Sequence, residues 1–176
     1  MLLTRRRFVA AALCWQSVYA PAQTPGDARV KARLALTLAR FTQWSPAAFA
    51  TPTEALTICV LHRSEPLAEA FAELGGQAAA GRSVKVTLNP EKLPGSCHVL
   101  FVHESSTRAS AAALATIADA PILTIGDAEG FAARGGMVEL VNVNDAIKLD
   151  VNLKALRSAQ LGLSSQVLKF ARQVRE

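Results

Sequence analysis

Two histidines in this sequence each come directly after an apolar run, where a side chain could bind a ligand or a metal ion. His62 follows the run LTICVL, and His103 follows the run HVLFV. If both runs are parallel strands, the two imidazoles lie at the carboxyl edge of a sheet, where open α/β folds bind ligands. Glu65 and Glu104 stand nearby, but no third ligand follows at a spacing typical of metal sites. A small-molecule or catalytic site at this edge and two solvated strand ends both fit the pattern.

A catalytic serine would need a recognisable setting. Ser105 and Ser106 follow the second histidine, but they lack the G-x-S-x-G context of a nucleophile elbow. They better suit the cap of a following helix, because a serine hydroxyl can accept a hydrogen bond from the first turn. The sequence therefore predicts no catalytic residue, and we expect the protein not to be an enzyme.

A third candidate is the glycine-rich stretch ILTIGDAEGFAARGGMVELV at residues 122–141. Phosphate-binding α/β proteins also place a glycine loop after a strand. This loop matches neither G-x-G-x-x-G nor a P-loop with its lysine. Asp127 and Glu129 would repel a phosphate where backbone N–H groups should attract it. We interpret the glycines as turn residues at a short helix and at the start of a hairpin, and we expect no cofactor and no metal.

The first 22 residues have the layout of an export signal, with a basic start, a short apolar centre and small residues at the end. Arg5, Arg6 and Phe8 fit a twin-arginine motif, and Ala20–Ala22 fits a cleavage site. The apolar centre is too short to span a bilayer of about 30 Å. We expect residues 1–22 to be cleaved, and residues 23–176 to form a single domain in the periplasm.

Two cysteines remain after cleavage, Cys59 and Cys97. Each lies in or beside an apolar run, and the two runs are expected to be neighbouring strands. In an oxidising compartment an isolated pair is a candidate disulfide. Two buried free thiols acting as small apolar side chains are the alternative. The expected compartment favours the disulfide.

The charge of the mature chain argues against nucleic-acid binding. The whole chain has a formal charge of +5, but three of its basic residues belong to the leader. Residues 23–176 carry 16 basic and 14 acidic side chains, which is nearly balanced. We therefore expect no nucleic-acid partner.

The elements that position these residues alternate between helix and strand. Val30, Leu34, Leu38 and Phe41 recur at helical spacing in DARVKARLALTLARF and predict one apolar stripe. Apolar runs then alternate with helical segments, and two β-rich runs flank a predicted hairpin turn at 144–145. The pattern predicts an α/β fold: a three-layer αβα domain with a mostly parallel sheet that ends in an antiparallel hairpin and a C-terminal helix.

On that expected terminal helix, three cations form a basic stripe: Lys169, Arg172 and Arg175. Cations near a helix C-terminus complement the helix dipole, which is the interpretation we favour. Contact with a partner or with an anionic membrane is the alternative.

Several motifs, taken in order, resemble the YfiR-like family of periplasmic proteins. The resemblance spans nearly the whole mature chain, from VKARLALTLARFTQW through LTICVLH, GRSVKVTL and CHVLFVHESS. It is most specific in PILTIGDAEGFAARGGMVEL and in VNLKALRSAQLGLSSQVLKFA. Many members have glycine where Gln160 stands, and often an apolar-Asn-Phe sequence at 138–140.

The resemblance implies a function that composition does not show. The best-understood relatives bind the periplasmic domain of an inner-membrane diguanylate cyclase and hold its cytoplasmic domain inactive, which lowers cyclic-di-GMP signalling and biofilm growth. It also implies a homodimer and a structural disulfide that matches Cys59 and Cys97 by position. The partner-binding surface is not identified. The alternative is a periplasmic small-molecule sensor or a cryptic enzyme that uses the His62/His103 edge.

Overall fold

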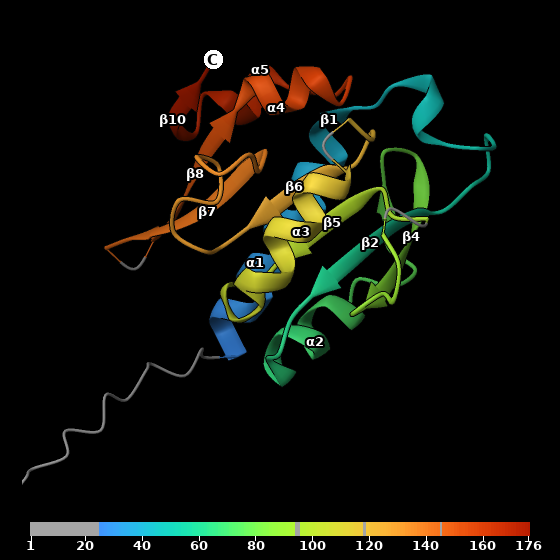
Figure 1. Cartoon of the computed structure of the whole chain (residues 1–176). Helices are drawn as coiled ribbons and strands as arrows, with labels where there is room; N and C mark the ends of the chain where they lie inside the picture. Colours follow the sequence, from blue (N-terminus) through green and yellow to red (C-terminus); the bar gives the residue numbers. More distant parts are fainter. Residues whose placement is uncertain (1–24, 94–95, 118, 145) are drawn as a thin grey trace, which may run out of the picture.

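The computed structural model describes residues 25–93, 96–117, 119–144 and 146–176 (Figure 1). The expected export signal, including Arg5, Arg6 and Phe8, lies outside the described residues. The α-helices are α1 Pro25–Phe41, α2 Glu65–Ala72, α3 Thr107–Ile117, α4 Leu153–Ser158 and α5 Ser165–Leu168. Two short 3-10 helices are η1 Pro46–Ala48 and η2 Glu104–Ser106. The strands are β1 Thr42–Gln43, β2 Leu56–Leu61, β3 Ala78–Ala79, β4 Arg82–Leu88, β5 Val99–Val102, β6 Leu123–Gly126, β7 Val138–Val143, β8 Ala146–Asn152, β9 Gly162–Leu163 and β10 Ala171–Arg175.

The main sheet has eight strands in the order β10-β8-β7-β6-β5-β2-β4-β3. Five of its seven neighbouring pairs are parallel, and the β7–β8 hairpin and the β3–β4 pair are antiparallel. Asn144 in the hairpin turn has a φ of 50°, a left-handed conformation that asparagine tolerates well. The predicted mostly parallel sheet and its hairpin are confirmed.

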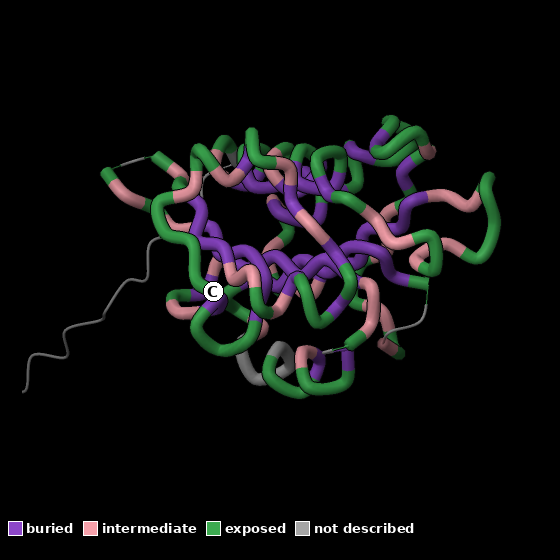
Figure 2. Tube along the Cα trace, turned by 90° about the horizontal axis from the view of Figure 1, so that it is seen from above, coloured by how far each residue is buried: buried purple, intermediate pink, exposed green. Residues whose placement is uncertain are grey.

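Helices cover both faces of the sheet (Figure 1), as predicted for a three-layer fold. β5 shows how the layers form, because its side chains alternate between the two faces. Val99 and Phe101 join the larger core under α1 and α2, whereas Leu100 and Val102 join a smaller core under α3. All four are buried, which explains why the strand reads as an unbroken apolar run. Figure 2 shows the buried residues concentrated in the centre of the molecule.

The predicted stripe on α1 is only partly correct. Val30 and Phe41 are 46% and 39% exposed. The buried side is instead a row of small residues at helical spacing, namely Ala28, Ala32, Ala35 and Ala39. Small side chains let a helix backbone approach its neighbours closely, so the apolar face of α1 consists mainly of alanine and is not marked by the largest side chains.

The long C-terminal helix is a correction to the sequence-based prediction. Two short helices, α4 and α5, are followed by the strand β10, which pairs parallel to β8. Arg172 in β10 donates to the buried carboxylate of Asp150 in β8, with Nε 2.8 Å from Oδ1. This pairing and the ladder with β8 outweigh the local preference for helix.

Candidate functional site

The predicted histidine edge exists, and its side chains are buried. The register pairs Leu61 of β2 with Val102 of β5, so His62 and His103 follow at adjacent strand ends. They are 8% and 4% exposed, which rules out the solvated alternative. With Lys31, Ser105 and Asp127 they form a group that we call the strand-end cluster.

Each histidine closes its own turn. The backbone N–H of Ser64 donates to Nδ1 of His62, and that of Ser105 donates to Nδ1 of His103, both at 3.2 Å. The same bond therefore occurs in the sequences HRS and HES, two residues after each strand. For His103, an accepting Nδ1 places the ring proton of the neutral imidazole on Nε2.

His103 also lies between a hydroxyl and a carboxylate. Oγ of Ser105 is 2.7 Å from Nδ1 and accepts from the backbone N–H of Arg63 at 3.2 Å. On the other side, Nε2 is 3.6 Å from Oδ2 of Asp127 and has no hydrogen-bond partner among the described residues. Hydroxyl, imidazole and carboxylate follow in the order used by acyl-transfer enzymes, with the roles of the two ring nitrogens exchanged.

The carboxylate of Asp127 also interacts with groups other than His103. Nζ of Lys31 lies 2.8 Å from Oδ2 of Asp127, and the two side chains are 11% and 2% exposed. Oδ1 of the same carboxylate accepts the backbone N–H of Glu104 at 2.7 Å. Because a buried cation neutralises Asp127, this carboxylate raises the basicity of His103 far less than a free one would. The cluster ties α1 to the ends of β5 and β6.

The pKa values follow the same geometry. Burial lowers the pKa of His103, Asp127 partly opposes this, and Lys31 lowers it further. Burial also lowers the pKa of Lys31, but Asp127 and Asp27, whose Oδ2 lies 3.3 Å from Nζ of Lys31, together outweigh it, so that pKa is raised. At neutral pH the cluster therefore holds a neutral His103 and an ion pair.

The backbone N–H groups of the glycine-rich loop bind a carboxylate, and this carboxylate is a side chain of the same protein. The carboxylate of Glu139 accepts the N–H groups of Gly130 and Ala132 at 2.8 and 3.0 Å. Gly130 has a positive φ of 73°, as expected for a turn residue. A Cβ at Gly126 or Gly136 would lie less than 3 Å from the buried ring of Phe131. The interpretation as a turn agrees with this geometry, but the expected short helix is wrong, because residues 129–135 form turns. Glu139 binds to backbone N–H groups of the kind that a phosphate would need.

His98 has a structural environment. Its Nδ1 accepts the backbone N–H of Thr57 at 3.1 Å, and its ring stacks on Phe49 at 4.5 Å between centroids. Trp44 packs edge-on against Phe49 and donates Nε1–H to the carbonyl of Ala39. Burial lowers the pKa of His98, partly opposed by Glu54.

The predicted disulfide is confirmed. Cys59 in β2 is bonded to Cys97, with their Cα atoms 5.7 Å apart. Both β4 and β5 flank β2, so the connection at 89–98 crosses β2 to reach β5. Leu93 of that connection packs against the smaller core, to which both cysteines belong. The bond therefore fastens the crossover to the sheet on the α3 side.

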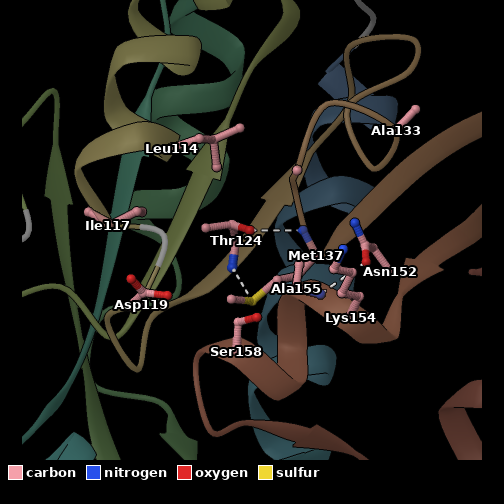
Figure 3. Close-up of a pocket in the computed structure, with 11 residues that line it drawn as sticks. Leu114, Ile117, Asp119, Thr124, Ala133, Met137, Asn152, Lys154, Ala155 and Ser158 are labelled. Carbon is pink, nitrogen blue, oxygen red and sulfur yellow. Dashed lines mark hydrogen bonds between the residues drawn. The ribbon is translucent and has the colours of Figure 1, made fainter. Parts of the chain in front are cut away.

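A cavity of about 330 Å³ opens beside α3, which we call the α3 cavity. Figure 3 shows it between Leu114 and Ile117 of α3 and the first turns of α4. Thr124 and Met137 lie between these walls, and Thr124 Oγ1 accepts the backbone N–H of Met137 at 2.9 Å. The volume is at the lower end of the roughly 300–1,000 Å³ of small-molecule pockets.

The polar groups of the α3 cavity lie on opposite walls. Asp119 follows α3 and Lys154 belongs to the first turn of α4; both are exposed, and neither forms an ion pair with a described residue. Asn152 makes two hydrogen bonds, because its Oδ1 caps α4 through Ala155 N–H and its Nδ2 donates to the carbonyl of Ala132. The arrangement suits a small molecule with an apolar body and polar ends. It shares no residue with the strand-end cluster.

The predicted basic stripe lies on the β10 edge and not on a helix. Lys169 caps α5, and Arg172 and Arg175 belong to β10. The helix-dipole interpretation therefore does not apply to the two arginines. The hydrogen bonds and charge of Asp150 raise the pKa of Arg172.

Sequence reasoning missed three kinds of residue. Lys31 interrupts the buried alanine row of α1, and Glu139 interrupts the apolar run MVELV; a single charge in such a pattern could have marked both as buried and paired. The α3 cavity has no comparable signal, because its lining comes from α3 and the residue Asp119 after it, β6, the loop at 131–137, the end of β8 and α4.

No group of three or more His, Cys, Asp or Glu side chains within the described residues could hold a metal ion. In the same part of the chain, no helix is long and apolar enough to cross a membrane.

Comparison with known proteins gives one clear result. A family model described as YfiR/HmsC-like matches residues 28–172. No curated protein is significantly similar to the chain. Among solved structures, the chain is similar to the crystal structure of the ABC domain in complex with L-Trp from Streptococcus pneumonia, with a TM-score of 0.53 and 16% identity. The match covers 81% of this chain and only 60% of that one, so it shows a likeness of fold alone.

Proposed function

The chain belongs to the YfiR/HmsC-like family, and we propose that it is a periplasmic regulatory binding protein. In this proposal it binds the periplasmic domain of an inner-membrane diguanylate cyclase, or a related membrane sensor, and inhibits it. The observation that carries the proposal is the family match over residues 28–172. Residues 1–22 would direct export by the twin-arginine route and then be removed. Residues 23–176 would form the single mature domain, acting as a homodimer as its relatives do.

The state of the candidate sites supports a binding role. The charged atoms of the strand-end cluster are engaged with one another, most directly through the ion pair between Lys31 and Asp127, and the His103 ring is buried. The backbone donors of the glycine loop are engaged by Glu139. Binding through a surface needs neither site to be open.

The proposal is tested by measuring cyclic-di-GMP in cells that lack the chain and in cells that express it again. We expect the level to rise on deletion and to return on expression of the exported chain. A matched chain in which Arg5 and Arg6 are both changed to Lys tests whether the effect requires export. The sequence of its mature domain is unchanged, so a difference would not come from the fold. An unaltered cyclic-di-GMP level in every strain would contradict the proposal.

A second candidate function is favoured by one observation, the α3 cavity. We propose that a small amphipathic molecule could be sensed there and not at the His62/His103 edge. Binding to the folded state alone raises the melting temperature by mass action. A ligand found in this way should lose its effect in Ala155→Leu, which narrows the cavity, and keep it in Ala112→Leu on the exposed side of α3. Equal loss in both variants would contradict this assignment.

A further inference from the structure

The C-terminal part of the chain carries a charge that differs from the rest of the mature protein. Residues 146–176 contain six basic and two acidic side chains, whereas residues 23–145 contain ten basic and twelve acidic ones. The six cations belong to β8, α4, the end of α5 and β10, which lie together at one edge of the sheet (Figure 1). We call this group the basic edge: Lys148, Lys154, Arg157, Lys169, Arg172 and Arg175.

Most of the basic edge is not neutralised. Of the two acidic residues in 146–176, Asp150 is buried and paired with Arg172, and Glu176 lies 3.9 Å from Arg157. The other four cations are exposed and form no ion pair with any described residue. This leaves an excess of positive charge along β10 that is available to an anionic surface.

An exposed aromatic side chain stands within this charge. Phe170 is 78% exposed, the most exposed of the large apolar side chains among the described residues, and it lies between Lys169 and the first residue of β10. Val174, further along the same strand, is 40% exposed. An aromatic ring flanked by cations is typical of segments that rest in the headgroup region of a bilayer.

We propose that the basic edge docks on an anionic lipid surface, with Phe170 entering the headgroup region and the cations contacting phosphates. A second copy of the chain is a poor occupant, because pairing β10 with β10 would bring like charges together. The proposal rests on the proposed periplasmic location, but it does not depend on the cyclase. Docking would hold the protein at the membrane, where a membrane-embedded partner presents its periplasmic domain.

The test is sedimentation of residues 23–176 with vesicles. We expect binding to vesicles of phosphatidylethanolamine and phosphatidylglycerol in 0.1 M salt, loss of binding in 0.5 M salt, and no binding to phosphatidylcholine alone. The triple variant Lys148→Glu, Lys169→Glu, Arg175→Glu should bind at least about 100-fold more weakly, at about fivefold for each cation removed. Phe170→Ser should bind about tenfold more weakly. Arg172 is left unchanged because it neutralises the buried carboxylate of Asp150.

The control variant Arg33→Glu, Lys85→Glu, Lys92→Glu changes the net charge equally at exposed cations outside the basic edge, and Phe41→Ser is the control for Phe170. Both should keep at least half of the vesicle affinity. Absence of binding to anionic vesicles, or an equal loss in the two triple variants, would overturn the proposal. Either result leaves the cyclic-di-GMP experiment unaffected, so the two failures can be told apart.

Discussion

The strand-end cluster and the α3 cavity differ in whether their charged side chains are paired within the protein or exposed to solvent. In the cluster, the side chains of Lys31, Asp127 and His103 are buried and contact one another, so these reactive groups are shielded from solvent, although Ser105 is exposed. In the cavity, Lys154 and Asp119 face solvent without an ion partner among the described residues, and the space between them is open. Residue types therefore indicate where chemistry is possible, but packing decides whether an outside molecule can reach it.

The largest effect is expected at the ion pair. Asp127→Ala should lower the free energy of unfolding by about 3–5 kcal/mol, because the buried Lys31 ammonium then keeps only the more exposed carboxylate of Asp27, at 3.3 Å. Urea unfolding of the mature domain measures this. The double variant Lys31→Met, Asp127→Leu should recover most of the loss, since no buried charge remains. A single variant as stable as the parent would mean that the cluster is solvated and open.

The second largest effect on stability is expected from removal of the disulfide, which lies on the face of the sheet covered by α3. Replacing Cys59 and Cys97 by Ala should cost about 2–5 kcal/mol, because the unfolded chain is no longer cross-linked. Thermal unfolding of the oxidised parent, the reduced parent and the double variant gives the size of the effect. Thiol labelling of the denatured, unreduced protein should find no free cysteine, and two labelled thiols would contradict the bond.

The histidines give a smaller effect that depends on pH. Burial holds the pKa values of His103 and His98 below the ordinary value of about 6.5, so the unfolded chain binds more protons as the pH falls below that value. The free energy of unfolding should therefore fall between about pH 7 and pH 5, by up to about 1.4 kcal/mol per pH unit for each histidine. His103→Gln should have a shallower slope. An unchanged slope would show that His103 is not buried in its neutral form.

The smallest effect is expected at the cavity. Asn152→Ala should cost about 1 kcal/mol, because it removes the N-cap of α4. Hydrogen exchange should also increase in α4 and in the loop at 131–137, which the Asn152 amide joins. Protection lost throughout the sheet would contradict this local view of the cavity wall.

Much of the fold follows from the sequence. The central strands, the hairpin and the disulfide could be predicted because they depend on runs of apolar residues, on turn residues and on a single cysteine pair. The terminal strand could not, because local periodicity favours helix over 171–175 and only the contact between Arg172 and Asp150, together with the ladder to β8, reverses it. The buried face of α1 could not be predicted either, because the row of residues that it buries is mainly alanine.

The candidate site was predictable in part. The histidines stand at the strand ends as expected, but their burial depends on Lys31 and Asp127, which are 96 residues apart in the chain. Likewise, the glycine loop was correctly interpreted as a turn, while the pairing of Glu139 with the N–H groups of that loop follows only from the three-dimensional packing. A lone charge in an apolar run can indicate a buried and paired side chain, but it does not identify the distant group that pairs with it.

The most direct test of the proposed function is the identity of the partner. The tagged mature protein would be crosslinked in intact cells, captured from detergent-solubilised envelopes and analysed by mass spectrometry. We expect one inner-membrane protein with a periplasmic domain and a cytoplasmic diguanylate cyclase domain to be enriched over a tagged, exported control protein. Enrichment of a membrane sensor of another class would contradict the cyclase and keep the regulatory role. Recovery of no membrane protein would contradict the regulatory role itself.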